Sequence, residues 1–463
     1  TSSKTSSKTS SKTSSKTSSK TSSSNRPKPG PDGTTLLHSF ARLKPLQVNG
    51  KSVDRTGGTR ADKQIEHFDS TTVVCGGTNF NHSKAVIEPD ATQLHVYETI
   101  AQPLVHKFLE GYDVDMISYG QTGSGKTFTM FGPPFSMEKA AKALGPNGGA
   151  GVSSDGIVLP EHGIILRSGL EILQAVEAMN NGDSRTATLH GSMVEMSILT
   201  LTDQSVVDLI NNRKICFVDK AHHLQGASMV PLRTAGDVVR MASSVETRLV
   251  RGTKMNDTSS RSHCCAVFTL SIAQGDRYQQ TRFQFFDLMG SERFKGGNAA
   301  HNTGASSKSS MGGWEGIFAN LSLSALMSAV EQAAKQRRRG SNKKQANPML
   351  DMSLTDLLSG SFRGHAITAM VTCVSQAPRN GGETYLTLKY GSGMASLLNI
   401  PKTAKWKCLS KNVDKAMKEH RSVATIVQRG VAGKYQALRS AQLAQWENEV
   451  EVLNELMSKR EGK

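Results

Sequence analysis

Residues 114–130 read Val-Asp-Met-Ile-Ser-Tyr-Gly-Gln-Thr-Gly-Ser-Gly-Lys-Thr-Phe-Thr-Met, and this stretch decides the fold. Its apolar start predicts a buried strand, its glycines predict a tight loop, and its end predicts the start of a helix. Gly120, Gly125, Lys126 and Thr127 satisfy the phosphate-loop pattern G-x-x-x-x-G-K-[ST]. A chain with 42 glycines meets this pattern by chance more easily, but the flanking strand and helix favour a nucleotide-binding loop.

The chemistry of this loop suits a nucleoside triphosphate. Glycines let successive backbone N–H groups turn inward, and the following helix adds the positive end of its dipole. Lys126 is expected to reach the β- and γ-phosphates, and the Thr127 hydroxyl is expected to bind the Mg²⁺ that bridges them.

Length and composition limit the domain organisation and the partners. The 463 residues suffice for one large α/β domain with extensions or for two ordinary domains. The low hydrophobic content of 37% indicates that polar and repetitive segments lie outside the core. The net charge of +17 indicates an acidic partner, which could be a nucleic acid, an anionic membrane or an acidic protein surface.

Cysteine usage and hydropathy predict a cytosolic protein with reduced thiols. The six cysteines form no C-x-x-C pair and show no metal-ligand spacing with histidine. No apolar run approaches the roughly 20 residues that span a bilayer, and the N-terminus carries no hydrophobic signal region.

Low-complexity segments mark the edges of the predicted folded part. Residues 1–20 are five copies of Thr-Ser-Ser-Lys, so 1–34 is expected to be a disordered arm that binds an acidic surface, is phosphorylated or serves as a linker. Residues 131–162 and 294–312 are rich in glycine and serine and are predicted to be surface loops.

Between these segments, apolar residues recur either every three to four residues, as in helices, or at every second residue, as in strands. It predicts strands at 36–46, 185–201, 206–210, 214–218 and 366–374, adjacent antiparallel strands at 265–272 and 281–288, and helices at 91–111, 163–179, 235–248, 317–334 and 384–398. This mixture predicts an α/β fold, a central mixed sheet with helices on both faces.

Two features beyond this pattern bear on partners. Lys335, Arg337, Arg338, Arg339, Lys343 and Lys344 place six cations within ten residues, either a solvated loop or a grip on an acidic polymer. Leu443, Trp446, Val450, Leu453 and Met457 follow a short heptad spacing. That seam predicts either packing against the main domain or a homodimer stalk.

Two further segments have the form of sensors that distinguish a triphosphate from a diphosphate. Asp287-Leu288-Met289-Gly290 follows a predicted strand and has the D-x-x-G form, in which the aspartate holds the metal and the glycine N–H meets the γ-phosphate. Residues 256–263, Asn-Asp-Thr-Ser-Ser-Arg-Ser-His, are dense in hydroxyls and could equally be a capped turn. Their order after the phosphate loop strengthens all three signals.

Taken together, the three motifs resemble those of a kinesin motor domain. The phosphate loop, the complete N-x-x-S-S-R-S-H at 256–263 and Asp287 to Glu292 are similar to the family's nucleotide motifs. Weaker similarity spans 36–398 and includes Arg42-Leu43-Lys44-Pro45, Asn320 to Leu326 and Thr387 to Gly391. The resemblance implies a motor domain at 35–398, a neck-linker-like segment at 399–415 and a helical neck or short coiled coil at 416–463.

The resemblance also implies a role for each matching residue. Ser260 and Asp287 would serve the Mg²⁺ with Thr127, Ser259 would help to place the attacking water, and Arg261 and Glu292 would form the salt bridge that closes the site. Gly290 would sense the γ-phosphate. The remaining nucleotide contacts would come from Arg42, Lys44, Pro45, Gly120, Gln121, Thr122, Gly123, Ser124, Gly125, Lys126, Phe128 and Asn256.

Departures from the family pattern concern mainly the microtubule-facing side. Met289 stands where the family has alanine, and Lys44 where it has arginine. Leu321 replaces a lysine, and residues 348–355 lack both cations of the usual segment. The run of cations at 335–344 could offset this loss by binding the acidic tails of tubulin.

The resemblance implies an ATP- and Mg²⁺-dependent microtubule motor in the cytoplasm and cytoskeleton, on microtubules of an axoneme or a spindle. The alternative is a non-motile, weakly hydrolysing structural protein that binds microtubules as a tether. A nucleic-acid-dependent ATPase would explain the charge, but the chain lacks helicase-like motifs. No membrane partner is expected.

Overall fold

The computed structural model describes residues 35–48, 51–52, 64–143, 158–182, 184–198, 204–219, 223–248, 262–291, 323–328, 353–358, 361, 364–430 and 435–462. The predicted arm at 1–34, the cations of 335–344 and most of the predicted helix at 317–334 lie outside them.

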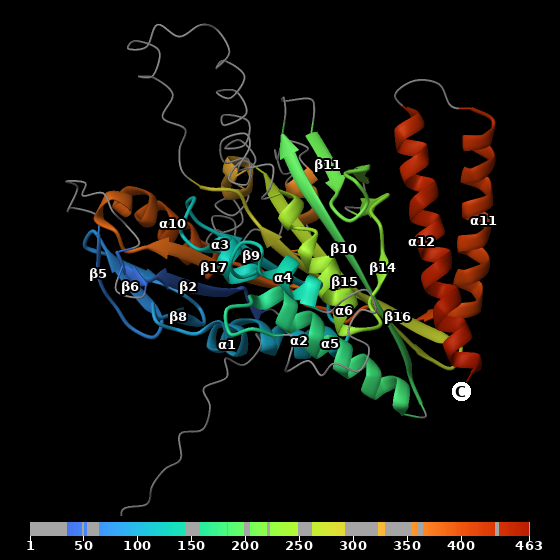
Figure 1. Cartoon of the computed structure of the whole chain (residues 1–463), viewed down its shortest axis with the longest axis horizontal. Coiled ribbons are helices and arrows are strands. Elements are labelled where there is room, and N and C mark those ends of the chain that lie inside the picture. Colours follow the sequence, from blue (N-terminus) through green and yellow to red (C-terminus); the bar gives the residue numbers. More distant parts are fainter. Residues whose placement is uncertain are drawn as a thin grey trace, which may run out of the picture.

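A twelve-stranded mixed sheet forms the centre of the described structure (Figure 1). Strands β16, β9, β17, β2 and β8 pair in parallel, whereas the run from β13 to β16 is antiparallel. The strands are β2 (His38–Lys44), β8 (Ala85–Ile87), β9 (Val114–Tyr119), β10 (Thr186–Ile198), β11 (Gln204–Asp208), β12 (Ile215–Val218), β13 (Leu224–Gln225), β14 (Val230–Pro231), β15 (His263–Gln274), β16 (Arg277–Asp287), β17 (Ile367–Ser375) and β19 (Lys407–Cys408). The predicted α/β class and the antiparallel pair β15–β16 are confirmed.

Short strands complete the sheet structure of the described residues. β5 (Ile65–Phe68), β6 (Thr72–Cys75) and β7 (Thr78–Asn81) form a three-stranded sheet. Two further pairs are β1 (Thr35–Leu36) with β18 (Leu398–Asn399), and β3 (Gln47–Val48) with β4 (Lys51–Ser52).

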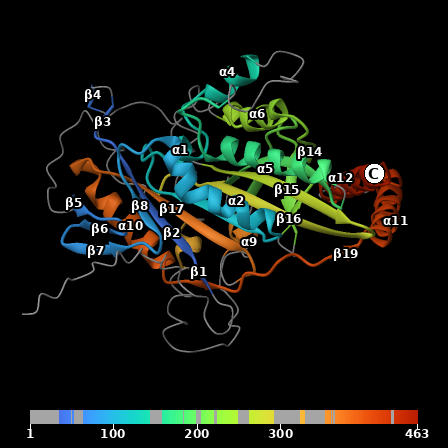
Figure 2. The ribbon, with the colours of Figure 1, turned by 90° about the horizontal axis from the view of Figure 1, so that it is seen from below.

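Helices cover both faces of the sheet, as the sequence predicts (Figure 2). One face carries α1 (Gln93–Val96), the π-helical η2 (Tyr97–Ala101), α2 (Gln102–Leu109), α5 (Ile164–Asn181) and α6 (Ala235–Ser243). The other carries the helical residues 323–328, α9 (Ser353–Leu357), the 3₁₀ turn η6 (Pro378–Asn380) and α10 (Gly381–Met394). Helix α10 ends four residues before the predicted end at 398 and is followed by β18.

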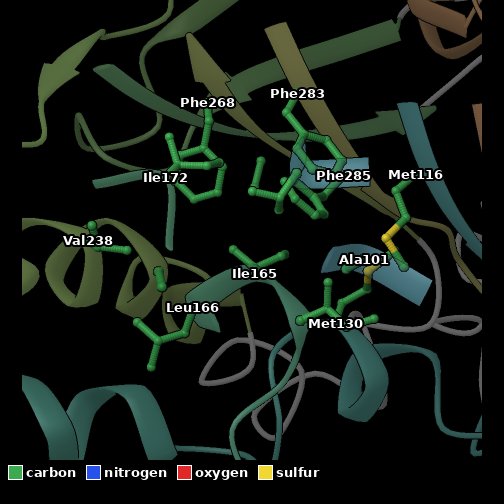
Figure 3. Close-up of a cluster of buried hydrophobic side chains, with 14 of the residues drawn as sticks. Ala101, Met116, Met130, Ile165, Leu166, Ile172, Val238, Phe268, Phe283 and Phe285 are labelled. Carbon is green, nitrogen blue, oxygen red and sulfur yellow. The ribbon is translucent and has the colours of Figure 1, made fainter. Parts of the chain in front are cut away.

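The main hydrophobic core lies between α5 and the central strands. Figure 3 shows Phe268, Phe283 and Phe285 of the sheet facing Ile165 and Leu166 of α5. Phe283 and Phe285 stack with ring centroids 4.1 Å apart. This core holds the sheet rigid beside the phosphate loop, since close-packed interiors deform little.

Residues 131–162 are not only the surface loop that their composition predicts. The short helix α3 (Lys126–Met130) is followed by α4 (Ser136–Ala143), which packs on α6. Met137 of α4 is 1% exposed and belongs to the main core, with Ala140 and Ala141 packed beside it. The prediction was wrong here because tertiary contacts hold a helical stripe that is too short to show among glycines and prolines.

The C-terminal extension is a pair of helices at one end of the sheet, α11 (Leu409–Gln428) and α12 (Tyr435–Glu461) (Figure 1). The heptad seam faces its own chain: Trp446, Val450 and Leu453 pack with Tyr278 and Leu409. The seam was predicted either to pack against the main domain or to form a dimer stalk, and in this structure it packs against the main domain. None of the described helices combines the length and the apolar character that a membrane span requires.

Polar contacts fix α12 on the sheet. Asn448 donates to the backbone oxygen of Ala227 at 2.9 Å. Glu455 lies 3.3 Å from His190 Nε2 and 3.3 Å from Arg233 Nε, and Lys459 is 3.2 Å away. The contact with His190 is the largest of the effects that lower the pKa of Glu455 to about 2, against the opposing effect of burial.

We expect Glu455→Gln to loosen α12, because the substitution removes the charge that His190 and Arg233 face. Amide hydrogen exchange at pH 7 should become faster in α12 and remain unchanged in α5. Since the pKa of Glu455 is lowered from 4.5 to about 2, its contribution is complete above pH 4.5 and is lost as the pH falls towards 2.

Glu451→Gln, at an exposed position of the same helix, is the control and should leave the exchange unchanged. Equal exchange in α12 for the two variants would contradict an anchoring role for Glu455.

Candidate functional site

The phosphate loop leaves the carboxyl end of β9, which lies between the parallel strands β16 and β17. Open α/β sheets bind their ligands at this edge. Gly120 has φ +151°, and a Cβ there would lie 2.2 Å from the backbone oxygen of Cys373. Gly123 and Gly125 also have positive φ, at +76° and +103°. The loop therefore needs glycine at 120 for space and at 123 and 125 for backbone conformation.

Lys126 is folded onto its own loop and is only 7% exposed. Its Nζ donates to the backbone oxygens of Gly120 at 2.7 Å and of Gln121 at 2.8 Å. The side-chain oxygens of Ser124 and Gln121 are buried, and neither has a hydrogen-bond partner among the described residues. Buried polar atoms normally have partners, and the Ser124 hydroxyl can donate to a phosphate oxygen, so the loop fits such a ligand.

Asp287, at the end of β16, faces the first turn of α3. Thr127 Oγ1 donates to Asp287 Oδ2 at 2.7 Å, and Ser118 Oγ donates to Oδ1 at 3.1 Å. The structure thus brings together two of the three predicted metal ligands from separate elements. A carboxylate and a hydroxyl are donors of the kind that Mg²⁺ prefers, so these residues fit that ion.

The segment after Asp287 runs along the phosphate loop. Leu288 donates its N–H to the backbone oxygen of Ser118 at 3.3 Å, and Ser291 donates to that of Gly120 at 3.1 Å. Gly290, between them in sequence, is buried. The predicted γ-phosphate sensor therefore lies in a segment that is directly bonded to the loop.

Met289, the departure from the usual D-x-x-G pattern, packs into a second hydrophobic core, separate from the main one. Its side chain is 5% exposed and lies in the second core with Ile117 and Leu326. Its N–H donates to His263 Nδ1 at 3.3 Å. Burial, together with the charges of Arg248 and Lys126, lowers the pKa of His263 to about 3, so at neutral pH the ring is uncharged and Nδ1 can accept this hydrogen bond.

Three residues without a predicted role in the site, Arg248, Ser262 and Glu195, form a buried polar network with Asp287. Arg248 is 3% exposed and lies 3.5 Å from Asp287 Oδ2 through its Nη1. Its Nε donates to Ser262 Oγ at 3.1 Å, and Ser262 in turn donates to Glu195 Oε1 at 2.6 Å.

Glu195 completes this buried network. Arg213 Nη1 lies 2.5 Å from its second oxygen. Although burial raises the pKa of Glu195, hydrogen bonds from Ser262 and Arg213 lower it overall, so the carboxylate is charged. Ser262 lies inside the hydroxyl-rich motif, but no signal in a single sequence marks Glu195 or Arg248, which converge only on folding.

The structure brings together part of the predicted adenine-binding side of the site. Arg42 Nη1 donates to Gln93 Oε1 at 2.9 Å and to Thr129 Oγ1 at 2.8 Å, and its guanidinium lies 5.4 Å from the ring centre of Phe128. Lys44 Nζ donates to the backbone oxygen of Gly123 at 2.9 Å. Arg42 therefore supports α3. The Phe128 ring that it contacts remains 41% exposed.

Several predicted site residues lie outside the described residues. They are Asn256, Ser259, Ser260, Arg261 and Glu292. Their roles remain predictions.

Comparisons with known proteins agree with this geometry. Residues 42–397 match the family model described as the kinesin motor domain. Kinesin-like protein KIF27 of Homo sapiens is 31% identical over 335 residues, which cover 68% of this chain and 21% of that protein. Kinesin-related protein 7 of Dictyostelium discoideum is 28% identical over 390 residues, 82% of this chain and 27% of its own length. The chain thus spans less than a third of the length of these two relatives.

Solved structures share the fold. A KIF14 dimer in the two-heads-bound state, with AMP-PNP and in complex with a microtubule, has a TM-score of 0.61 at 24% identity and covers 80% of this chain and 96% of its own. The structure of a fast kinesin has a TM-score of 0.60 at 21% identity, with 80% and 94% coverage.

We expect Asp287→Asn to weaken nucleotide binding only when Mg²⁺ is present. The amide keeps the shape of the carboxylate but removes the charge that we expect to bind a cation beside Thr127. ADP affinity at millimolar Mg²⁺ should fall at least about tenfold, and affinity in EDTA should change little, as measured by fluorescence titration. Asp90→Asn, at an exposed position, is the matched control. An equal loss of affinity with and without Mg²⁺ would contradict the assignment of Asp287 to the metal.

Proposed function

The chain belongs to the kinesin motor-domain family, and on this premise we propose that it is a microtubule-stimulated ATPase that converts ATP hydrolysis into movement or force along microtubules. The observation that carries the proposal is the convergence of Lys126, Thr127 and Asp287 at one edge of the sheet. The proposed location follows: the cytoskeleton, on microtubules, including those of axonemes or spindles.

In the proposed reaction the phosphate loop and its lysine bind ATP. Lys126 exchanges the loop carbonyls for the β- and γ-phosphates, and Ser124 finds a phosphate oxygen for its buried hydroxyl. Bound Mg²⁺ would neutralise phosphate charge beside Thr127 and Asp287, with Ser260 as a further ligand. Ser259 positions the attacking water, and Arg261 with Glu292 closes the site. Positioning and charge neutralisation supply most of the rate enhancement in such reactions.

Coupling to movement is proposed to pass through residues 289–291. The N–H of Ser291 is bonded to Gly120 of the loop, while Met289 packs in the same buried cluster as Leu326 of the helical residues 323–328. A shift of Gly290 towards the γ-phosphate would therefore be transmitted to that helix, which we propose lies on tubulin. Packed clusters pass on such shifts because they have few intermediate arrangements.

A second candidate function is that of a non-motile microtubule tether with slow hydrolysis. The C-terminal seam favours it, since Trp446 and Leu453 are packed within the chain and are not available to pair two motors. The replacement of a microtubule-facing lysine by Leu321 favours it as well.

The steady-state ATPase rate, measured against microtubule concentration at low and physiological salt, decides between the two functions. We expect at least about tenfold stimulation for the wild type and none for Lys126→Ala, which removes the phosphate-binding charge. Tight binding to microtubules without stimulation would establish the tether, and absence of nucleotide binding would contradict both functions.

The cations at 335–344 should contribute to microtubule affinity electrostatically. Replacing Arg337, Arg338 and Arg339 by glutamine should weaken binding several-fold at low salt, and the difference should shrink as salt screens the charges. Co-sedimentation with microtubules measures this affinity. The control replaces Lys4, Lys8 and Lys12 of the N-terminal repeats, and a larger effect there would assign the electrostatic contact to the arm instead.

A further inference from the structure

Helix α4, which the sequence did not predict, follows the phosphate-loop helix α3 in the chain and packs on α6. The chain passes from α3 to α4 through a tightly packed turn. A Cβ on Gly132 would lie 2.8 Å from the backbone oxygen of Glu161, and Phe131 is 3% exposed. Helix α4 therefore has a fixed position relative to α3.

A hydrogen bond joins α4 to the segment that follows α6. Glu246 Oε1 accepts the N–H of Met137 at 3.0 Å, and Glu246 is only 5% exposed. The N–H of Met137 lies in the first turn of α4, where backbone donors have no partner within the helix. A carboxylate at this end is also favoured by the helix dipole.

The position of Glu246 relates this bond to the nucleotide site. Glu246 and Arg248 lie in one short turn, in which the N–H of Arg248 donates to the oxygen of Val245 at 3.0 Å. Arg248 contacts Asp287, and Asp287 accepts from Thr127 of α3. The contacts thus form a closed ring that runs from α3 through α4, Glu246, Arg248 and Asp287 back to α3.

The separation in sequence argues for a role beyond capping. Met137 and Glu246 are 109 residues apart, whereas an ordinary cap comes from the residue just before the helix. Phe135, which precedes α4, has no side-chain acceptor and has φ +61°. The N–H of Met137 instead donates to a carboxylate in the same turn as Arg248, so this bond links the position of α4 to that of the turn.

We propose that Glu246 is a positioning residue for the Mg²⁺–nucleotide site. By tying the turn at 244–248 to α4, it keeps Arg248 against Asp287 and thereby keeps the carboxylate directed at Thr127 and the metal. The inference rests on the proposed function, since it concerns retention of the Mg²⁺ complex of the nucleotide. It adds a residue from outside the three nucleotide motifs.

The test is the dissociation rate of a fluorescent ADP analogue from Glu246→Ala and Glu246→Gln. At millimolar Mg²⁺ we expect about fivefold faster release from Glu246→Ala, the factor that corresponds to the loss of one net hydrogen bond. Glu246→Gln retains an acceptor oxygen and should release at a rate close to that of the wild type. In EDTA the three proteins should release at the same rate. Glu177→Ala, exposed on α5, is the control and should match the wild type throughout.

A double-mutant cycle with Arg248→Ala tests whether Glu246 acts through the arginine. The double variant should release no faster than Arg248→Ala alone, because the ring is already open. If Arg248→Ala does not fold, Arg248→Lys takes its place in the cycle.

Additive effects of the Glu246 and Arg248 substitutions on the release rate would overturn the inference. A lower melting temperature of Glu246→Ala with an unchanged release rate would also overturn it, because Glu246 would then only cap α4. Failure of the wild type to bind the analogue would instead overturn the proposed function. The two failures are therefore distinguishable.

Discussion

The hydrogen bond from Thr127 to Asp287 is the contact on which the nucleotide site depends. It joins the helix after the phosphate loop to the end of the neighbouring strand, at 2.7 Å and with Asp287 1% exposed. Burying a carboxylate costs free energy unless it is paired and hydrogen-bonded. Ser118 and Arg248 provide that environment from two other elements, so the geometry of the site requires several parts of the fold to be in place together.

The mixed sheet makes this convergence possible. Parallel pairing of β16 with β9 places Asp287 opposite Ser118, directly before the phosphate loop. Antiparallel pairing of β15 with β16 places Cys264 opposite Asp287, so the residues just before β15, including Ser262, lie at the same edge. The main core then fixes this edge by packing α5 against Phe268, Phe283 and Phe285.

The C-terminal helices are held less completely than the core. A cleft of about 610 Å³ lies between α11, α12 and the sheet, and charged residues such as Arg282, Lys415 and Glu449 line it. The apolar contact is a separate small cluster around Tyr278 and Leu453. Interfaces of this mixed character are typical of units that move relative to one another. Glu455 is one of the polar anchors that hold α12 across this interface.

The sequence by itself determined the fold class and the phosphate loop, and it predicted that Thr127 and Asp287 serve one metal ion, because short motifs encode local backbone geometry and phosphate chemistry. Most long periodic elements were also predictable, since apolar spacing reports which face of a helix or strand is buried. Helix α4 was not predictable from the sequence. The sequence also did not decide whether the seam at Trp446 forms a dimer stalk or packs within the chain. Only the tertiary structure brought Glu195, Arg248 and Glu246 to the site. Their partners are far away in the chain, and the burial that makes such charges effective does not exist before the chain folds.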